Sequence, residues 1–229
     1  MKPAGPFAIP APWLFGAQLA VVTSVNDPQH LARVQVRLLA ADADGNAVMW
    51  ARVAVPFAGD NRGAFLIPDV DDEVLVVFVA GDMRAPIVIG GLWNGTQSPP
   101  EALPGDRVDR WTLTGKAGSH IAIIEPARGA PKIELETRDG VKATLTDAGG
   151  GKIECIAGQN SITMDAQGVT VRSAQKVSVF VNGTSIDVLS GLVNVTAPMA
   201  IFSGMISCQV LQTTSVISAS YTPGAGNLW

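Results

Sequence analysis

Apolar and polar residues alternate along most of the chain, and this period predicts strands. Between residues 15 and 95 five segments are strand-like: GAQLAVVTSV, RVQVRLL, VMWARVAVPFAG, EVLVVFVAG and PIVIGGLWNG. Each is rich in β-branched or alternating apolar residues. Asn26, Asp27 and Pro28 separate the first two segments and are typical of a turn. The pattern predicts five short strands with hairpin connections.

Five strands over a segment of this size suit a small Greek-key barrel of the OB kind, so we expect an all-β domain over residues 15–95. The segment that begins at Glu73 is apolar on both faces: Val74, Val76 and Phe78 share one face, and Leu75, Val77 and Val79 share the other. We therefore expect it to be covered on both sides, inside the barrel or against another subunit.

The second half of the chain has shorter alternating segments. KIELET, VKATLT, GKIECIA, NSITMD, GVTVRS and KVSVFVNG are separated by turn signals at 138–140, 149–151, 166–168 and 182–183. This pattern favours a β-solenoid or a stack of β-ribbons over residues 111–229. The proline-rich residues 1–14 predict an extended arm, and the aperiodic residues 96–110 predict a linker.

Charge is distributed unevenly along this second half. Residues 111–176 contain eight basic and seven acidic side chains, whereas residues 177–229 contain Asp187 as their single charged residue. An uncharged stack of strands is an aggregation hazard unless partner strands cover its edges. The distribution favours several copies wound around one axis, with apolar side chains inside.

The overall composition limits the possible partners and the site of synthesis. Hydrophobic residues make up 47% of the 229 residues and charged residues 16%, with a formal net charge of -4. Without a cluster of positive charge, nucleic acid is not an expected partner. The prolines near the N-terminus interrupt any signal-peptide core, so we expect synthesis in the cytoplasm without a signal peptide. Cys155 and Cys208 are expected to be small buried side chains.

The first half resembles the OB domain of contractile-injection spike proteins, a group that includes the phage baseplate assembly protein V family and VgrG proteins. The resemblance rests on GAFLIPDVDDEVLVVFVAGDMRAPIVIGGLWNG, preceded by RVQVRLL and WARVAVPFAG. It covers residues 16–95, about a third of the chain. It implies a trimeric OB collar followed by a triple-stranded β-helix that acts as a spike in a phage tail baseplate or an injection particle.

The resemblance also implies partners. The short linker leaves no room for a lysozyme domain, and a 14-residue arm implies a separate baseplate hub protein. The His-x-His pattern of some spike tips is missing, which implies a PAAR-type tip protein or a bare tip, and the target would be a cell envelope. We expect collar and arm contacts at Trp13, Trp50, Phe65, Phe78 and Trp93. Contacts to a tip protein are expected at Tyr221, Leu228 and Trp229.

Motifs for chemistry are weak. TGKAGSH lacks the first glycine and the hydroxyl residue of a phosphate-binding loop. Ser119 and His120 are neighbours on a predicted strand and point to opposite faces. Asp69, Asp71, Asp72 and Glu73 lack the spacing of a calcium loop. We therefore predict no catalytic residue, cofactor or metal, and hence no enzyme.

Two other functions stay open at this point. A trimeric tail fibre or adhesin would share the same shaft but would need a recognition surface at its end. A binder of single-stranded nucleic acid or oligosaccharide could use the OB face, although the acidic composition speaks against nucleic acid.

Overall fold

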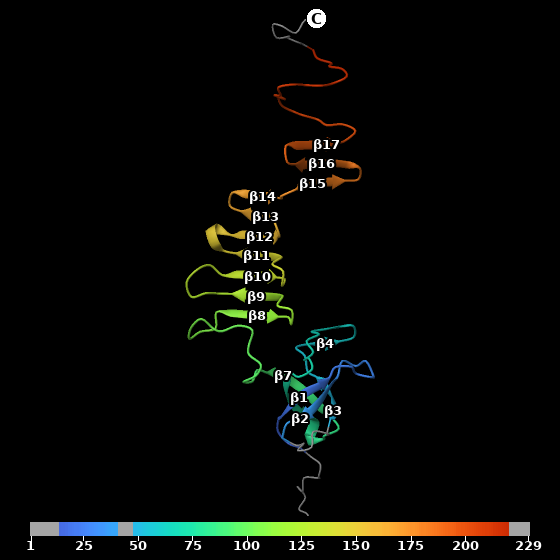
Figure 1. Cartoon of the computed structure of the whole chain (residues 1–229), viewed down its shortest axis with the longest axis vertical. Helices are drawn as coiled ribbons and strands as arrows, with labels where there is room; N and C mark the ends of the chain where they lie inside the picture. The colour runs from blue at the N-terminus through green and yellow to red at the C-terminus, as the bar shows by residue number, and fades with distance from the viewer. Residues whose placement is uncertain (1–13, 41–47, 220–229) are drawn as a thin grey trace, which may run out of the picture. The chain divides into compact units, whose positions relative to one another are not determined.

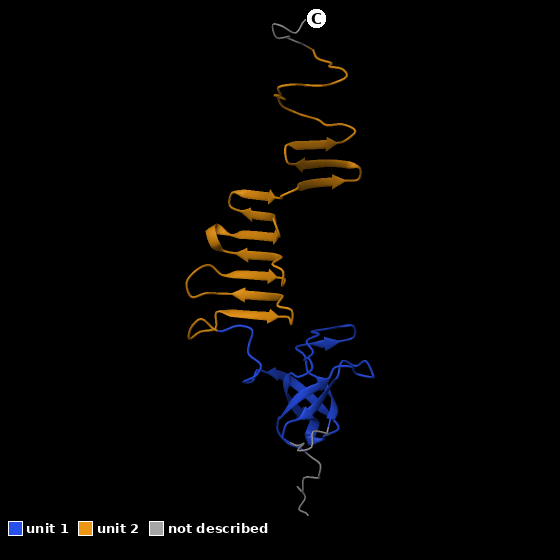
Figure 2. Cartoon of the chain, in the orientation of Figure 1, with its two compact units in different colours: residues 1–102 blue, residues 103–229 orange. Residues whose placement is uncertain are grey.

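The computed structural model describes residues 14–40 and 48–219. The chain divides into two compact units, residues 1–102 and 103–229 (Figure 2). The boundary falls inside the segment that was expected to be a linker. Both units are built from strands, and each described unit also contains one short 3₁₀ turn, Val79–Gly81 in the first and Ala148–Gly150 in the second. Among the described residues, none of the helical segments has the length and apolar character required to cross a membrane.

Unit 1 is a closed barrel with the strand order β1-β2-β3-β7-β6 (Figure 1). Its strands are β1 (Gln18–Ser24), β2 (Val34–Leu38), β3 (Val48–Val53), β6 (Glu73–Phe78) and β7 (Pro86–Leu92). The all-β barrel is confirmed. Consecutive strands pair antiparallel in β1–β2, β2–β3 and β6–β7, and β3 pairs in parallel with β7.

The barrel core follows from the two-residue period of the strands. Side chains that alternate along each strand point inward and pack together, and the core consists of Ala20, Val22, Val34, Val36, Leu38, Ala51, Val74, Val76, Phe78 and Val88. On β6 the residues between these, Leu75 and Val77, are half-buried. The strand with two apolar faces therefore has one face in the barrel core.

The turn between β1 and β2 is organised by a buried carboxylate. Asp27 accepts hydrogen bonds from the backbone N–H groups of Gln29, Leu31 and Arg33. The Arg33 guanidinium lies 2.7 Å from Asp27 Oδ1. That side-chain pairing, helped by the backbone donors, holds the pKa of Asp27 well below its usual range. Asp27 thus organises the whole connection from β1 to β2 and is buried there, beyond the turn chemistry expected from the sequence.

The third predicted strand is shorter than expected. β3 ends at Val53, and a separate hairpin of β4 (Ala58–Gly59) and β5 (Arg62–Gly63) follows it. Phe57 and Phe65 flank this hairpin with exposed side chains. Its turn contains Asn61 with a positive φ of 52°, a conformation that asparagine tolerates better than most residues.

Unit 2 contains two antiparallel sheets whose strands follow one another along the chain (Figure 1). The seven-stranded sheet consists of β8 (Arg110–Thr114), β9 (His120–Ile124), β10 (Lys132–Glu136), β11 (Lys142–Thr146), β12 (Lys152–Ala157), β13 (Asn160–Asp165) and β14 (Gly168–Arg172). The three-stranded sheet consists of β15 (Lys176–Val181), β16 (Thr184–Leu189) and β17 (Leu192–Thr196). We call the seven-stranded sheet the strand stack.

All six alternating segments identified in this half are strands, and the stack also includes β8 and β9. The predicted turns are confirmed as well: Gly140, Gly149 to Gly151, Gly168 and Gly183 all have positive φ. Glycine adopts this conformation without the steric cost that a Cβ imposes. The turn chemistry therefore explains why consecutive strands fold back on one another.

Candidate functional site

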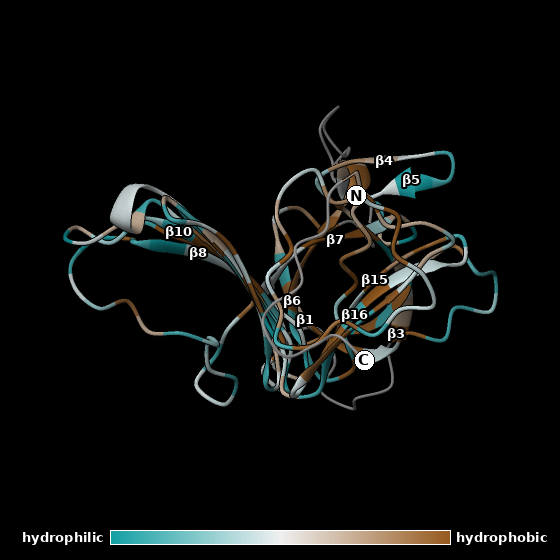
Figure 3. Cartoon of the chain, turned by 90° about the horizontal axis from the view of Figure 1, so that it is seen from above, coloured by the Kyte–Doolittle hydropathy of each residue, from teal (hydrophilic) through white to brown (hydrophobic). Residues whose placement is uncertain are grey.

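One face of the strand stack is apolar except for Asn160, which lies at the start of β13 opposite Ala157. The paired register places on it Trp111, Leu113, Ile121, Ile123, Ile133, Leu135, Ala143, Leu145, Ile153, Cys155, Ile162, Met164, Val169 and Val171. The large side chains of this face are 38% to 66% exposed. Figure 3, which views the stack from above, shows both hydrophobic and hydrophilic segments in its superposed strands. A continuous apolar surface of this kind marks an interaction site.

Part of this face is concave. A groove of about 870 Å³ is lined by Leu113, Ile121, Leu135, Cys155 and Ile162 among others. Its walls are predominantly apolar. The groove therefore suits an apolar occupant.

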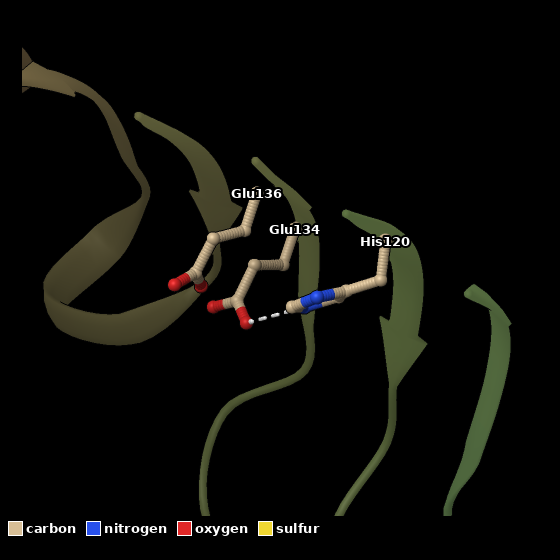
Figure 4. Close-up of side chains that lie close together, drawn as sticks. All are labelled: His120, Glu134 and Glu136. Carbon is tan, nitrogen blue, oxygen red and sulfur yellow. Dashed lines mark ion pairs between the residues drawn. The ribbon is translucent and has the colours of Figure 1, made fainter. Parts of the chain in front are cut away.

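The opposite face of the stack is polar and carries a network of ion pairs. Glu134 is at its centre, with a side chain that is 8% exposed. Lys132 and Lys142 place their Nζ atoms 2.9 Å and 2.8 Å from Glu134 Oε2. Lys142 also lies 3.0 Å from Glu136 Oε2, and His120 Nε2 lies 3.6 Å from Glu134 Oε1 (Figure 4). The sheet thus separates an apolar face from a charged one.

The electrostatics of this network keep Glu134 ionised. Burial raises the pKa of its carboxyl, but the hydrogen bonds from Lys142 and Lys132 outweigh burial and bring the pKa to about 2. The same contacts raise the pKa of Lys142. Both partners therefore carry their charges across the physiological range.

His120, Glu134 and Glu136 bring their ligand atoms within 4.8 Å of one another. Sequence reasoning did not identify this cluster, because its members are brought together by the pairing of β9 with β10. The two lysines already neutralise the carboxylates, so a divalent cation would have to displace an ammonium group. We interpret the cluster as a surface ion-pair network.

The three-stranded sheet also has a largely apolar face. It is formed by Val177, Val179, Val181, Ile186, Val188, Val193 and Val195, with Thr184 at its end. On its other face, Ser178 donates a hydrogen bond to Asp187, and Lys176 Nζ lies 3.4 Å from the same carboxylate. The hydrogen bond from Ser178, followed by the contact with Lys176, lowers the pKa of Asp187. The single charged residue of residues 177–229 is therefore paired.

The collar residues that were expected to make contacts differ in how exposed their side chains are. Phe65 and Trp93 are 80% and 70% exposed and are available for a partner. Trp50 is half-buried, and the Arg33 guanidinium lies 5.7 Å from the centre of its ring. Phe78 is 7% exposed and packs in the barrel core, so its expected role as a surface contact is wrong.

Four expected contact residues, Trp13, Tyr221, Leu228 and Trp229, lie outside the described residues. The expectation for the cysteines is wrong, since Cys155 and Cys208 are both exposed. Cys155 belongs to the apolar face of the stack and is exposed there in the described chain.

The residues from Asp69 to Glu73, around the start of β6, take part in several hydrogen bonds. Asp72 Oδ2 accepts from the Asp69 N–H, and Glu73 Oε2 accepts from Asn94 Nδ2, both at 2.8 Å. Gln97 Nε2 donates to the Asp71 carbonyl at 2.9 Å. These contacts tie the chain after β7 to the start of β6.

Comparison with known proteins follows the same division of the chain. Residues 18–93 match the type VI secretion system/phage-baseplate injector OB domain. The match begins with β1 and ends one residue after β7, so it covers the closed barrel. This chain is VgrG-like and carries an injector OB domain.

Two curated relatives are type VI secretion system spike proteins of Pseudomonas aeruginosa. VgrG5 is 36% identical over 140 residues, which is 56% of this chain and 18% of VgrG5. VgrG1c is 32% identical over 110 residues, 45% of this chain and 15% of the relative. VgrG3 of Vibrio cholerae, another such spike protein, is 44% identical over 55 residues, 24% of this chain and 5% of the relative. The VgrG-like chain spans less than a fifth of the length of these relatives.

Proposed function

We propose that the VgrG-like chain is a homotrimeric structural spike of a contractile injection machine. The apolar face of the strand stack carries this proposal. Three copies that turn these faces toward one axis would bury them, while the face that carries the ion-pair network around Glu134 would stay on the outside. The resulting prism is a triple-stranded β-helix.

The mechanical role follows from the backbone of the stack. Neighbouring strands are held by ladders of backbone hydrogen bonds at a spacing of about 4.8 Å, so seven strands make roughly 30 Å of stiff shaft. Such a shaft transmits force to a small area of a target envelope. The relatives that match this chain are named spike proteins, which supports a structural role and no enzymatic one.

The partners of this spike follow from the exposed aromatic side chains. Phe65 and Trp93 are suited to contacts with a baseplate hub protein or with the neighbouring collar. The arm residue Trp13 would add to the same contacts. Tyr221, Leu228 and Trp229 would form the seat of a PAAR-type tip protein. The particle would be a phage tail baseplate or a related injection apparatus.

Light scattering of the purified chain tests the proposal. A homotrimer has a mass of about 71 kDa, three times the 23.8 kDa of one chain. A stable monomer at micromolar concentration would refute the trimeric spike. Electron microscopy of native particles with a labelled chain then tests its location, and a label away from the tail axis would contradict the spike role. Binding of the trimer to a glycan array would favour a fibre or adhesin instead.

A further inference from the structure

β14 and β15 are consecutive strands that do not pair with each other. In the described part of unit 2, all other consecutive strands form antiparallel pairs. β14 ends the seven-stranded sheet and β15 begins the three-stranded sheet, although only residues 173–175 connect them (Figure 1). Each strand consequently has one edge with unpaired backbone groups.

The sequence of the connection explains why the chain does not reverse there. The other connections in unit 2 each contain or adjoin a residue with positive φ, such as Gly158 before β13 or Asn182 and Gly183 before β16. Tight hairpin turns need this conformation. Residues 173–175 are Ser, Ala and Gln, and none of these three described residues has a positive φ. The connection is long enough for a hairpin but lacks its turn chemistry.

A chain that does not reverse continues β15 in the direction of β14. Two strands that run in the same direction can pair only in parallel, and a parallel pair within one chain requires a crossover of about a dozen residues or more. Three residues cannot supply this crossover. The free edge of β14 therefore cannot be paired by β15 of the same chain.

We infer that β14 of one copy pairs in parallel with β15 of a neighbouring copy, so that each chain crosses to the next face of the spike at residues 173–175. This inference rests on the proposed homotrimer and specifies which strand edges join its chains. The contact is heterologous, because each copy offers β15 to one neighbour and accepts β15 of the other on its β14 edge. Three such contacts close into a ring.

The faces of the two strands are compatible with this pairing. Val169 and Val171 lie on the apolar face of β14, and Val177, Val179 and Val181 lie on the apolar face of β15. Each of these sets continues the apolar face of its own sheet, so pairing β14 with β15 joins one apolar face to the other. The exchange of strands leaves the apolar faces continuous from one sheet to the next. It also covers two open edges that would otherwise recruit other chains.

Disulfide trapping tests the inference in the full-length chain carrying C155A and C208A. T170C on the polar face of β14 is combined with S178C, and in two further variants with K176C or F180C, which lie on the polar face of β15. This set samples the neighbouring registers of a parallel pair. After oxidation, at least one pair is expected to give a covalent trimer on a denaturing gel, because each copy links to both neighbours.

The matched control combines T163C with T170C. Thr163 and Thr170 are paired across β13 and β14 of one chain, so this disulfide is expected within a chain and leaves a monomer band. The control reports that the stack is folded and that Thr170 is accessible to oxidant. Light scattering before oxidation reports the number of chains.

The outcomes separate the two proposals. A chain that is trimeric by light scattering before oxidation and gives a covalent trimer on the gel afterwards supports strand exchange. Trimers that yield monomer bands for all three β14–β15 pairs, while the control forms its internal bond, overturn strand exchange and retain the trimeric spike. A monomer before oxidation overturns both.

Discussion

Replacement of Leu145 by aspartate tests whether the apolar face of the stack is the trimer interface. Leu145 lies in β11 and is 42% exposed in a single chain. Full burial of a leucine contributes about 1.5–3 kcal/mol, so covering the exposed part contributes about 1 kcal/mol per chain. A carboxylate at the same place would be taken out of water, at a cost of several kcal/mol per chain.

These two effects add to at least 3 kcal/mol or so per chain, and three copies meet at one axis. We therefore expect Leu145→Asp to abolish the trimer at micromolar concentration and to leave the barrel folded, because the barrel core lies in the other unit. Light scattering measures the chain number. Circular dichroism and tryptophan fluorescence report on the fold.

The control is Thr146→Asp, one residue later on the opposite face. Thr146 is paired with Lys132 on one side and Lys152 on the other, so a new carboxylate there gains two cationic neighbours. It loses the hydrogen bond that Thr146 Oγ1 donates to the Pro131 carbonyl, at 2.9 Å. This variant should remain trimeric. Equal trimer stability of the two variants would refute the assignment of the apolar face.

Four further outcomes are expected. Phe78→Ala should destabilise the barrel by about 3–5 kcal/mol in urea titrations of the full chain, because it empties part of the core; a loss below 1 kcal/mol or so would contradict its burial. The stabilisation from ionised Glu134 is complete above its ordinary pKa of 4.5 and is lost as the pH falls through about 2. Glu134→Gln should therefore weaken the dependence of the melting temperature of the stack on pH between these values. An unchanged pH dependence would count against the network. Cys155 should resist thiol reagents in the trimer and react in the Leu145→Asp variant; fast reaction in an intact trimer would show that the apolar face is open. Introducing a hairpin turn with Ala174→Asn and Gln175→Gly should let β15 fold back on its own β14 and lower the trimer's melting temperature, whereas an unchanged melting temperature would argue against strand exchange.

The exposed apolar face of the strand stack explains why the chain is rich in hydrophobic residues and poor in charge. A sheet of one chain has two faces, and a second layer normally covers the apolar one. Here the described residues supply no second layer for the seven-stranded sheet. The high share of hydrophobic residues and the low share of charge are then the expected composition of a chain whose core is completed by other copies.

Several features were determined by the sequence alone. The two-residue period predicted the strands of both units, and glycine-containing connections predicted the turns, because each depends on local backbone geometry. The resemblance of residues 16–95 to injector OB domains predicted the barrel, which the structure and the family match confirm. The uneven distribution of charge predicted partner chains for the second half, and this stays part of the proposal.

Other features were decided only by tertiary structure. The burial of Phe78, the exposure of Cys155 and the grouping of Glu134 with two lysines all depend on which strands become neighbours. Register sets these neighbours, and register is a property of paired strands that the period of one strand does not contain. The missing pair between β14 and β15 is of the same kind, because an unpaired edge becomes visible only when all other strands have found their partners.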